Sequence, residues 1–414
     1  MYSNAFWMMA EKLVSIIGLV FVNSYMAKYI GPTDFGKITF ATTIFTFVQA
    51  MAWFGGQNIL FKRMSDKRKS GIALALHTQK QRRVIFALSS LIALFYLFFF
   101  TDTLTFVFGV ANCIATYYIV MDIFAVYNNT QLISRINALT NGAGLCIAYI
   151  FRFLISYLEL PVYTFSIPII LIPAIPYVIR CIYFYNTVED TSVLKSKTKK
   201  YNKYLISAGG SLLLSTLSIV VYTQVSNIFL AKVTSYSNLG IYNVALTLGS
   251  AYSFISVALI TSFFSKIYQE KDFEKMSRLL TSINRIVIVI TIFILFGFYF
   301  LGPYIISMLY GSAYKMAVEL VPIIILATMF SSLGTICYRF IIKYSGYKYL
   351  SYKMMLTGLL SIPFSYVMIN RYDVFGAAYC FLVVEVLSCT LLNYFFRSGM
   401  ILRIHLNVIG LMRR

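Results

Sequence analysis

Long apolar runs alternate with short polar stretches along the whole chain. A helix needs about 20 predominantly apolar residues to cross a bilayer, and most of the runs are close to this length. They predict twelve transmembrane helices, at residues 6–27, 38–61, 84–100, 104–126, 136–157, 163–185, 205–231, 239–264, 284–302, 319–342, 354–370 and 374–396. The longest connection on the predicted outer side, 302–318, is too short for a folded domain. The pattern therefore indicates an all-α polytopic membrane protein.

The composition supports this class and argues against a soluble nucleic-acid-binding protein. Of the 414 residues, 59% are hydrophobic and 12% are charged, and the mean hydropathy is +0.78. Soluble domains carry about 25% charged residues. The net charge of +21 would suit a nucleic acid, but the basic residues cluster in short stretches between apolar runs, as in polytopic membrane proteins. We therefore expect no nucleic-acid partner.

The connections between the predicted helices differ strongly in their Lys and Arg content. One alternate set holds 26 of the 35 basic residues, in 62–83, 127–135, 186–204, 265–285, 343–353 and the tail from 397. The other set, counted together with the ends of the adjoining helices, holds only 5 basic residues. They are Lys28, Lys37, Lys232, Lys315 and Arg371. Because positive charge is retained on the cytoplasmic side, both termini are predicted to be cytoplasmic. The N-terminus lacks a basic region and a small-residue cleavage site, so we expect the first helix to be retained.

The cysteines and histidines form no recognisable pattern. All six cysteines fall inside apolar runs without a CxxC pair, and His77 and His405 are far apart in the sequence. This usage predicts neither a disulfide framework nor a metal site. We expect the cysteines to be small, buried apolar side chains.

A basic stretch near the middle of the chain separates two halves. It divides the sequence into a six-helix half at 1–185, a linker at 186–204, a second six-helix half at 205–396 and a basic tail at 397–414. At an offset of 204 residues, MAKYIGPTDFGKITFA aligns with LAKVTSYSNLGIYNVA, which matches Lys28 with Lys232. Either this is a chance similarity of two helix–loop–helix junctions, or the halves are parallel repeats. Parallel repeats are expected to surround a central cavity and to alternate its access between the two sides of the membrane.

Polar side chains inside the predicted helices are candidates for a transport site, because they are costly in lipid and usually face a cavity or a partner. Glu11 and Lys12 lie in the first helix, where Lys12, Ser15 and Asn23 share one face. The seventh helix has a similar stripe, formed by Ser207, Ser211, Ser215, Ser218, Tyr222 and Ser226. Such stripes either line a cavity or allow close helix packing.

Five further charged side chains lie inside the predicted helices. Arg152, Arg180 and Arg339 are close to helix ends, where arginine either snorkels to the headgroups or faces the interior. Asp122 lies near the predicted cytoplasmic end of the fourth helix. Glu385 lies in the middle of the twelfth helix and is the best candidate for coupling to H⁺ or Na⁺. The alternative is a neutral glutamic acid bonded to a neighbouring helix, and no other cofactor is expected.

The junction after the first helix, NSYMAKYIGPTDFG, is predicted to be an external hairpin. Gly31 and Pro32 are expected to end the helix and to form the turn. Lys28 lies on the side that is poor in positive charge, close to Asp34 in the sequence. We predict that Lys28 and Asp34 form an ion pair that opens and closes with an outer gate.

Three segments carry a resemblance to a known family. They are YIGPTDFGKITFA after the first helix, QNILFKRMSDKR at the end of the second, and MLYGSAYKMAVELVPIIILA before and within the tenth. Together with the topology of the whole chain, they resemble the O-antigen flippases (Wzx type) of the multidrug/oligosaccharidyl-lipid/polysaccharide exporter superfamily. The resemblance implies a flippase of the bacterial inner membrane. Its substrate would be a polyprenyl-pyrophosphate-linked oligosaccharide, and its partners would be membrane lipids and other proteins of O-antigen assembly.

The resemblance also implies roles for the candidate residues. The pyrophosphate would be held through charge-assisted hydrogen bonds by Lys12, Lys28, Arg152 and Lys232. The sugars would exchange hydrogen bonds with Asn23 and Asn227. Coupling or gating would fall to Glu11, Asp34, Asp122 and Glu385.

Two other classes of membrane protein compete with a flippase. A multidrug or small-cation antiporter of the same superfamily should have an acidic or aromatic cavity, whereas the charges inside the predicted helices lean basic. An O-antigen polymerase or a membrane glycosyltransferase should show a long external loop or an acidic pair in an early one. The early external loops hold single acids only, at Asp34, Asp102 and Glu159, and the chain has no P-loop. We therefore expect a transporter and not an enzyme.

Overall fold

The computed structural model describes residues 2–187 and 198–409. Within these two ranges the chain is helical and contains no strand, which confirms the all-α class. The side chains of residues 2–14 and 198–208 lie outside the described part, as does most of the predicted linker.

The chain divides into two compact units, Met1–Val220 and Val221–Arg414, which are treated separately below. The first unit contains α1 (Tyr2–Trp53), α2 (Gly56–Asp66), α3 (Arg68–His77), α4 (Gln79–Phe100), α5 (Thr103–Met121), α6 (Ile123–Thr130), α7 (Ser134–Tyr157), α8 (Ser166–Thr187) and the start of α9 (Thr198–Phe229). The second contains the end of α9, α10 (Tyr236–Ser250), α11 (Ser253–Gln269), α12 (Phe273–Leu309), α13 (Ala317–Lys343), α14 (Tyr347–Cys389), α15 (Leu391–Tyr394) and α16 (Met400–Ile409).

The helices agree with the predicted membrane crossings. Nine segments of the described residues are long and apolar enough to cross a bilayer. They overlap the predicted helices from 84–100 onward, and the last of them, Tyr347–Tyr394, contains 354–370 and most of 374–396. Helix α1 accounts for the first two predicted helices. The chain is therefore a multi-pass membrane protein, and its helices are consistent with twelve crossings.

Two long helices are broken where the sequence predicts a connection. In α1, Gly31 has φ 76° and ψ 170°, a conformation that is open almost only to glycine, and Pro32 follows it. In α14, Asp373 has φ 48° and ψ −127° and separates the last two predicted helices. Both breaks confirm the predicted turn positions.

The predicted end of the second helix, at residue 61, is wrong. Helix α1 stops at Trp53, and Phe54 and Gly55 both take positive φ, 49° and 67°, before α2 begins at Gly56. An apolar run hides such a break, because the interruption depends on backbone conformation and not on polarity. A Cβ added at Gly209 would lie 2.5 Å from the Phe54 carbonyl oxygen, so the start of α9 packs directly on this bend.

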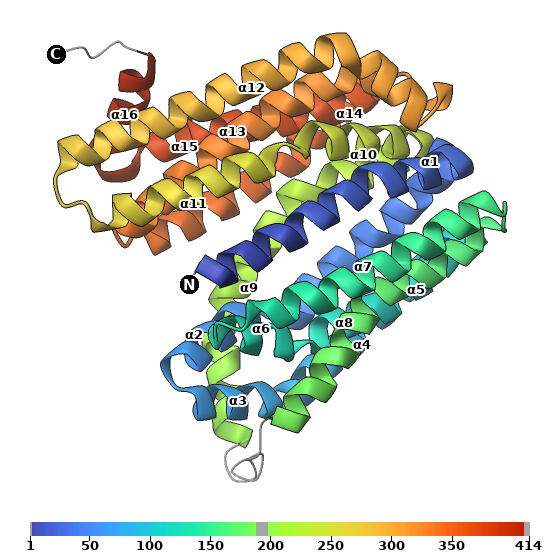
Figure 1. Ribbon diagram of the computed structural model, residues 1–414, viewed down its shortest axis with the longest axis horizontal. Helices are drawn as coiled ribbons and strands as arrows, with labels where there is room; N and C mark the ends of the chain where they lie inside the picture. The colour runs from blue at the N-terminus through green and yellow to red at the C-terminus, as the bar shows by residue number, and fades with distance from the viewer. Residues whose placement is uncertain (1, 188–197, 410–414) are drawn as a thin grey trace. The chain divides into compact units, whose positions relative to one another are not determined.

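The first unit is a bundle around α1. This helix packs against α4, α5 and α7, and α8 covers α5 and α7 (Figure 1). Its interior is apolar, with Phe40, Phe45 and Phe108 fully buried. Helix α4 leaves a row of aromatic side chains exposed, formed by Phe95, Phe98, Phe99 and Phe100. Such a face is stable in contact with lipid and unfavourable in water.

The second unit is organised around α13, which packs against α10, α12 and α14 (Figure 1). A buried apolar cluster joins α11, α12, α13, α14 and α16, with Phe264 and Phe340 among its largest members. The short C-terminal helix α16 lies against α12 and α15. Helix α12 carries its own exposed aromatic face, formed by Phe293, Phe296, Tyr299 and Phe300.

Candidate functional site

A polar contact between α1 and α7 brings together two of the predicted substrate-binding residues. Arg152 of α7 donates a hydrogen bond from Nη1 to the Oδ1 atom of Asn23 on α1. One turn earlier on α7, the Tyr149 hydroxyl donates to the Ser15 carbonyl at 3.3 Å. Gly18 makes this approach possible, because a Cβ there would lie 1.9 Å from the Tyr149 ring. We call Asn23, Arg152 and Tyr149 the α1–α7 site.

The positive charge of the α1–α7 site has no acidic partner among the described side chains. The ion pairs of the described residues do not include Arg152. Its Nε atom is buried and makes no hydrogen bond. A guanidinium N–H that is removed from water is destabilising unless an anion or another acceptor compensates it. The site is therefore suited to an anionic ligand.

A second arginine in the same unit is buried and neutralised. Arg180 of α8 forms an ion pair with Asp122 at 2.5 Å and donates to Asn141 at 2.8 Å. Asp122 also caps α6, because its carboxylate accepts a hydrogen bond from the Ala125 backbone N–H at 3.1 Å. Arg180 is 5% exposed and does not snorkel. The gating role of Asp122 stays a prediction, and in this structure its carboxylate joins two helices.

Glu385 is buried in the second unit, with 6% of its surface exposed. It lies close to the Ser331 side chain of α13 and interacts electrostatically with Lys353 of α14. Lys353 is 5% exposed and donates to Asn393 at 2.9 Å. The sequence analysis missed Lys353 because it lies at the end of a basic connecting stretch. A carboxylate with a hydroxyl and an amine nearby is suited to exchange a proton or a small cation.

Two connections of the first unit that are predicted to lie on the outer side are joined by a network of charges. Lys37 lies 3.1 Å from both Asp34 and Asp102, and Thr105 donates to Asp102 at 2.6 Å. Burial raises the pKa of Asp102, but the hydrogen bonds from Thr105 and Lys37 outweigh this and hold its pKa below the ordinary value. Burial lowers the pKa of Lys37, but the two carboxylates raise it further than burial lowers it. The ion pair that Asp34 forms in the structure is with Lys37, and the Lys28–Asp34 pair stays a prediction.

Three further predicted residues are described within their own units. Lys28 and Lys232 are exposed, and Asn227 is buried and donates to Gln224 at 2.9 Å. The side chains of Glu11 and Lys12 lie outside the described residues.

Two further polar side chains inside the predicted helices contact neighbouring helices of the second unit. Ser226, the last member of the stripe on the seventh predicted helix, forms a hydrogen bond with Ser365 of α14 at 2.9 Å. This contact matches the helix-packing interpretation of the stripe at that position. Arg339 donates to Thr261 at 3.1 Å and lies over the Phe264 ring.

The expectation that cysteine and histidine form no cluster is wrong. Cys337, Cys389 and His405 come from α13, the end of α14 and α16, and their ligand atoms lie within 4.8 Å of one another. Their separation in the sequence hid the cluster, because recognisable metal motifs place ligands a few residues apart.

The fold is shared with solved structures of a flippase and of multidrug transporters. The lipid II flippase MurJ in an inward closed conformation matches with a TM-score of 0.71 and 16% identity, over 99% of this chain and 91% of that one. An inward-facing multidrug resistance MATE transporter of the MOP superfamily matches with a TM-score of 0.64 and 11% identity, over 97% and 95%. An outward-facing MATE transporter gives 0.61 and 11%, over 98% and 94%. At these identities the likeness shows the fold alone.

The family is shown by the sequence. Residues 1–262 match the family described as "Polysaccharide biosynthesis protein". Since this is more than half of the chain, the protein belongs to that family. A search of curated proteins found no significant match.

Proposed function

We propose that this chain is a flippase of the bacterial inner membrane. It moves a polyprenyl-pyrophosphate-linked oligosaccharide, the O-antigen repeat unit, from the cytoplasmic to the periplasmic leaflet by alternating access. The observation that carries the proposal is the guanidinium of Arg152, which has a buried Nε atom without a hydrogen bond and no carboxylate partner among the described side chains. Membership of the polysaccharide biosynthesis family supports this substrate class, and the fold is similar to that of the lipid II flippase MurJ.

The chemistry of the α1–α7 site matches the part of such a substrate that cannot cross lipid unaided. A pyrophosphate is a multivalent anion, and arginine binds phosphate oxygens in a bidentate arrangement with charge-assisted hydrogen bonds. The Asn23 amide and the Tyr149 hydroxyl are neutral groups that can exchange hydrogen bonds with sugar hydroxyls. The polyprenyl tail needs no polar passage, because it can stay in the bilayer.

Movement against a gradient needs an energy source, and Glu385 is the proposed coupling residue. It is buried in the second unit beside Ser331 and Lys353. A carboxyl group inside a membrane protein changes its charge when it binds or releases H⁺ or Na⁺. In the proposed cycle this change of charge biases the transporter toward one of its two access states.

A multidrug or small-cation antiporter is the second candidate. It is favoured by the likeness to MATE transporters in two conformations. A site for organic cations should present unpaired acidic groups. In the described residues Asp122 is bound to Arg180, and Glu385 lies close to Lys353. These pairings favour an anionic substrate.

Deletion of the gene in its native host tests the proposal. Loss of a flippase should leave lipid A–core without O-antigen and trap single repeat units on the cytoplasmic side. Loss of a polymerase should display one unit on the surface, and loss of a drug exporter should raise drug sensitivity while the surface polysaccharide stays normal. Either of the last two results would overturn the proposal. A plasmid that carries the wild-type gene should restore the surface polysaccharide.

A further inference from the structure

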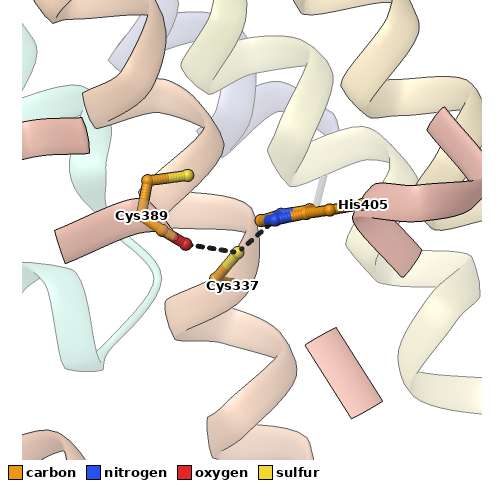
Figure 2. Close-up of side chains that lie close together, drawn as sticks. All are labelled: Cys337, Cys389 and His405. Atoms are coloured by element: carbon orange, nitrogen blue, oxygen red, sulfur yellow. Dashed lines mark hydrogen bonds between the residues drawn. The ribbon is translucent and has the colours of Figure 1, made fainter. Parts of the chain in front are cut away.

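Three potential metal ligands from three helices meet in the second unit (Figure 2). The Sγ atom of Cys337 on α13 lies 3.5 Å from Nε2 of His405 on α16. The Cys337 thiol also approaches the backbone carbonyl of Cys389, at the end of α14, at 4.0 Å. Both cysteines are buried and His405 is half-buried. We call Cys337, Cys389 and His405 the C-terminal cluster.

The separations in the cluster are close to those around one tetrahedral zinc ion. With Zn–S of about 2.3 Å and Zn–N of about 2.0 Å, two such ligands lie about 3.5 Å apart and two sulfurs about 3.8 Å apart. The Cys337–His405 distance already has this value. The remaining separations reach at most 4.8 Å, so a small rotation of the Cys389 side chain would complete three-ligand coordination.

A fourth position is available beside the cluster. Cys337 and His405 line a cavity of about 10 Å³, which has room for about one water-sized group. Asn284 of α12 lines the same cavity and is 2% exposed. Its Nδ2 atom donates to the Leu280 carbonyl at 2.7 Å, but its Oδ1 atom is buried and accepts no hydrogen bond. A buried acceptor without a donor beside two metal ligands is explained by a bound ion or by an ion-bound water.

The surroundings of the cluster support metal coordination. The Tyr394 hydroxyl lies 3.1 Å from Nδ1 of His405, so the second ring nitrogen has the polar partner that metal-ligating histidines usually have. Apolar side chains of α12, α13 and α16 enclose the site, including Leu280, Phe340 and Ile401. Two thiolates cancel the charge of a divalent zinc ion. The buried ammonium group of Lys353 is close enough to favour the thiolate form of both cysteines.

We propose that the C-terminal cluster is a structural zinc site, with Cys337, Cys389 and His405 as ligands and Asn284 or a water in the fourth position. The ion would fasten α16 to the ends of α13 and α14. On zinc binding each thiol loses its proton to solvent, and no electron is transferred. Zinc is favoured over a Cys337–Cys389 disulfide because a disulfide would leave His405 and Asn284 without a role. The C-terminal end of the chain is also predicted to lie in the cytoplasm, where the reducing environment disfavours disulfides.

The metal content of the purified full-length protein tests this proposal. Elemental analysis of detergent-solubilised protein should give about one zinc per chain. The substitutions Cys337→Ser and His405→Gln should each reduce the zinc content at least tenfold. Cys146→Ser is the matched control, because Cys146 is an exposed free cysteine outside the cluster, and it should leave the zinc content unchanged.

Measurements on the wild-type chain also test the proposal, and they do not depend on whether the variants fold. Removal of zinc with a chelator should make Cys337 and Cys389 reactive to alkylation and should lower the unfolding temperature, and added zinc should reverse both effects. Intact mass spectrometry distinguishes the alternatives. Wild-type protein that contains no zinc and does not bind added zinc, or that carries a Cys337–Cys389 disulfide, would overturn the proposal.

Discussion

Charged side chains inside the apolar bundles of this protein are compensated in different ways. Arg180 and Asp122 neutralise each other and connect three helices. Arg152 is held by the neutral Asn23 and keeps one buried N–H group without an acceptor. An arginine of the first kind stabilises the fold, whereas one of the second kind has binding capacity left for a substrate.

Removal of one partner of the Asp122–Arg180 pair should destabilise the first unit. Asp122→Asn leaves a buried guanidinium without its counter-charge, which costs about 3–5 kcal/mol in comparable pairs. The loss should appear as a lower unfolding temperature in detergent. The double variant Asp122→Asn with Arg180→Met should be more stable than Asp122→Asn alone. Glu274→Gln is the control, because the Glu274–Arg278 pair is exposed and should contribute little.

The network of Lys37 with Asp34 and Asp102 should make stability depend on pH in a defined way. The pKa of Asp102 is lowered from 3.8, so its contribution is complete above that value and is lost as the pH falls through the lower folded-state pKa. The pKa of Lys37 is raised from 10.5, so its contribution is complete below that value and is lost as the pH rises through the higher folded-state pKa.

The size of this contribution should be modest. The side chain of Asp102 is 42% exposed, so Asp102→Asn should cost about 0.2–1 kcal/mol at neutral pH. Thermal unfolding across the pH range measures it, with the exposed Glu159→Gln as the control. Identical pH profiles for wild type and Asp102→Asn would show that the network does not stabilise the protein.

At the residue scale, the sequence identified several polar positions but not their partners. Asn23 and Arg152 were both predicted, and the structure places them in contact. Their contact could not be derived from the sequence, because it depends on how α7 packs against α1. Lys37 was counted only as a basic residue on the outer side, and its bridge between two connections depends on the fold.

At the scale of helices, apolar runs located most elements, and backbone detail decided the rest. The Gly31–Pro32 break is visible in the sequence because glycine and proline have distinctive conformations. The Phe54–Gly55 break and the division of the eighth predicted helix into α10 and α11 lie inside apolar runs. Hydrophobicity alone therefore could not locate them.

The close approach of α1 and α7 should depend on Gly18. Gly18→Ala places a methyl group 1.9 Å from the Tyr149 ring, so the ring or the helix must move. Overpacking of this kind costs about 1–3 kcal/mol. The variant should unfold at a lower temperature and lose the Tyr149–Ser15 hydrogen bond. Gly142→Ala on α7 is the matched control, because a Cβ there meets nothing within 4 Å. Equal stability of the two variants would contradict the close packing.

For the whole molecule, the distribution of basic residues predicts the orientation in the membrane. Alkaline phosphatase is active only outside the cytoplasm, whereas a green fluorescent reporter folds in it. A C-terminal fluorescent fusion should therefore be bright, and a phosphatase fused after Asp102 should be active. The reverse pattern would place the termini on the outer side and would invert the direction that is proposed for transport.

The most direct test is transport by the purified protein in liposomes. A labelled polyprenyl-pyrophosphate-linked oligosaccharide should become accessible to a membrane-impermeant reagent faster with the protein than without it. Arg152→Gln should slow this step about 10- to 100-fold, the equivalent of about 1.5–3 kcal/mol for a charged hydrogen bond. Arg152→Lys should retain part of the rate, and the exposed Arg371→Gln should transport at the wild-type rate. Arg152→Gln protein that is folded and transports as fast as wild type would contradict the assignment of the α1–α7 site, and wild-type protein that moves no substrate would contradict the flippase itself.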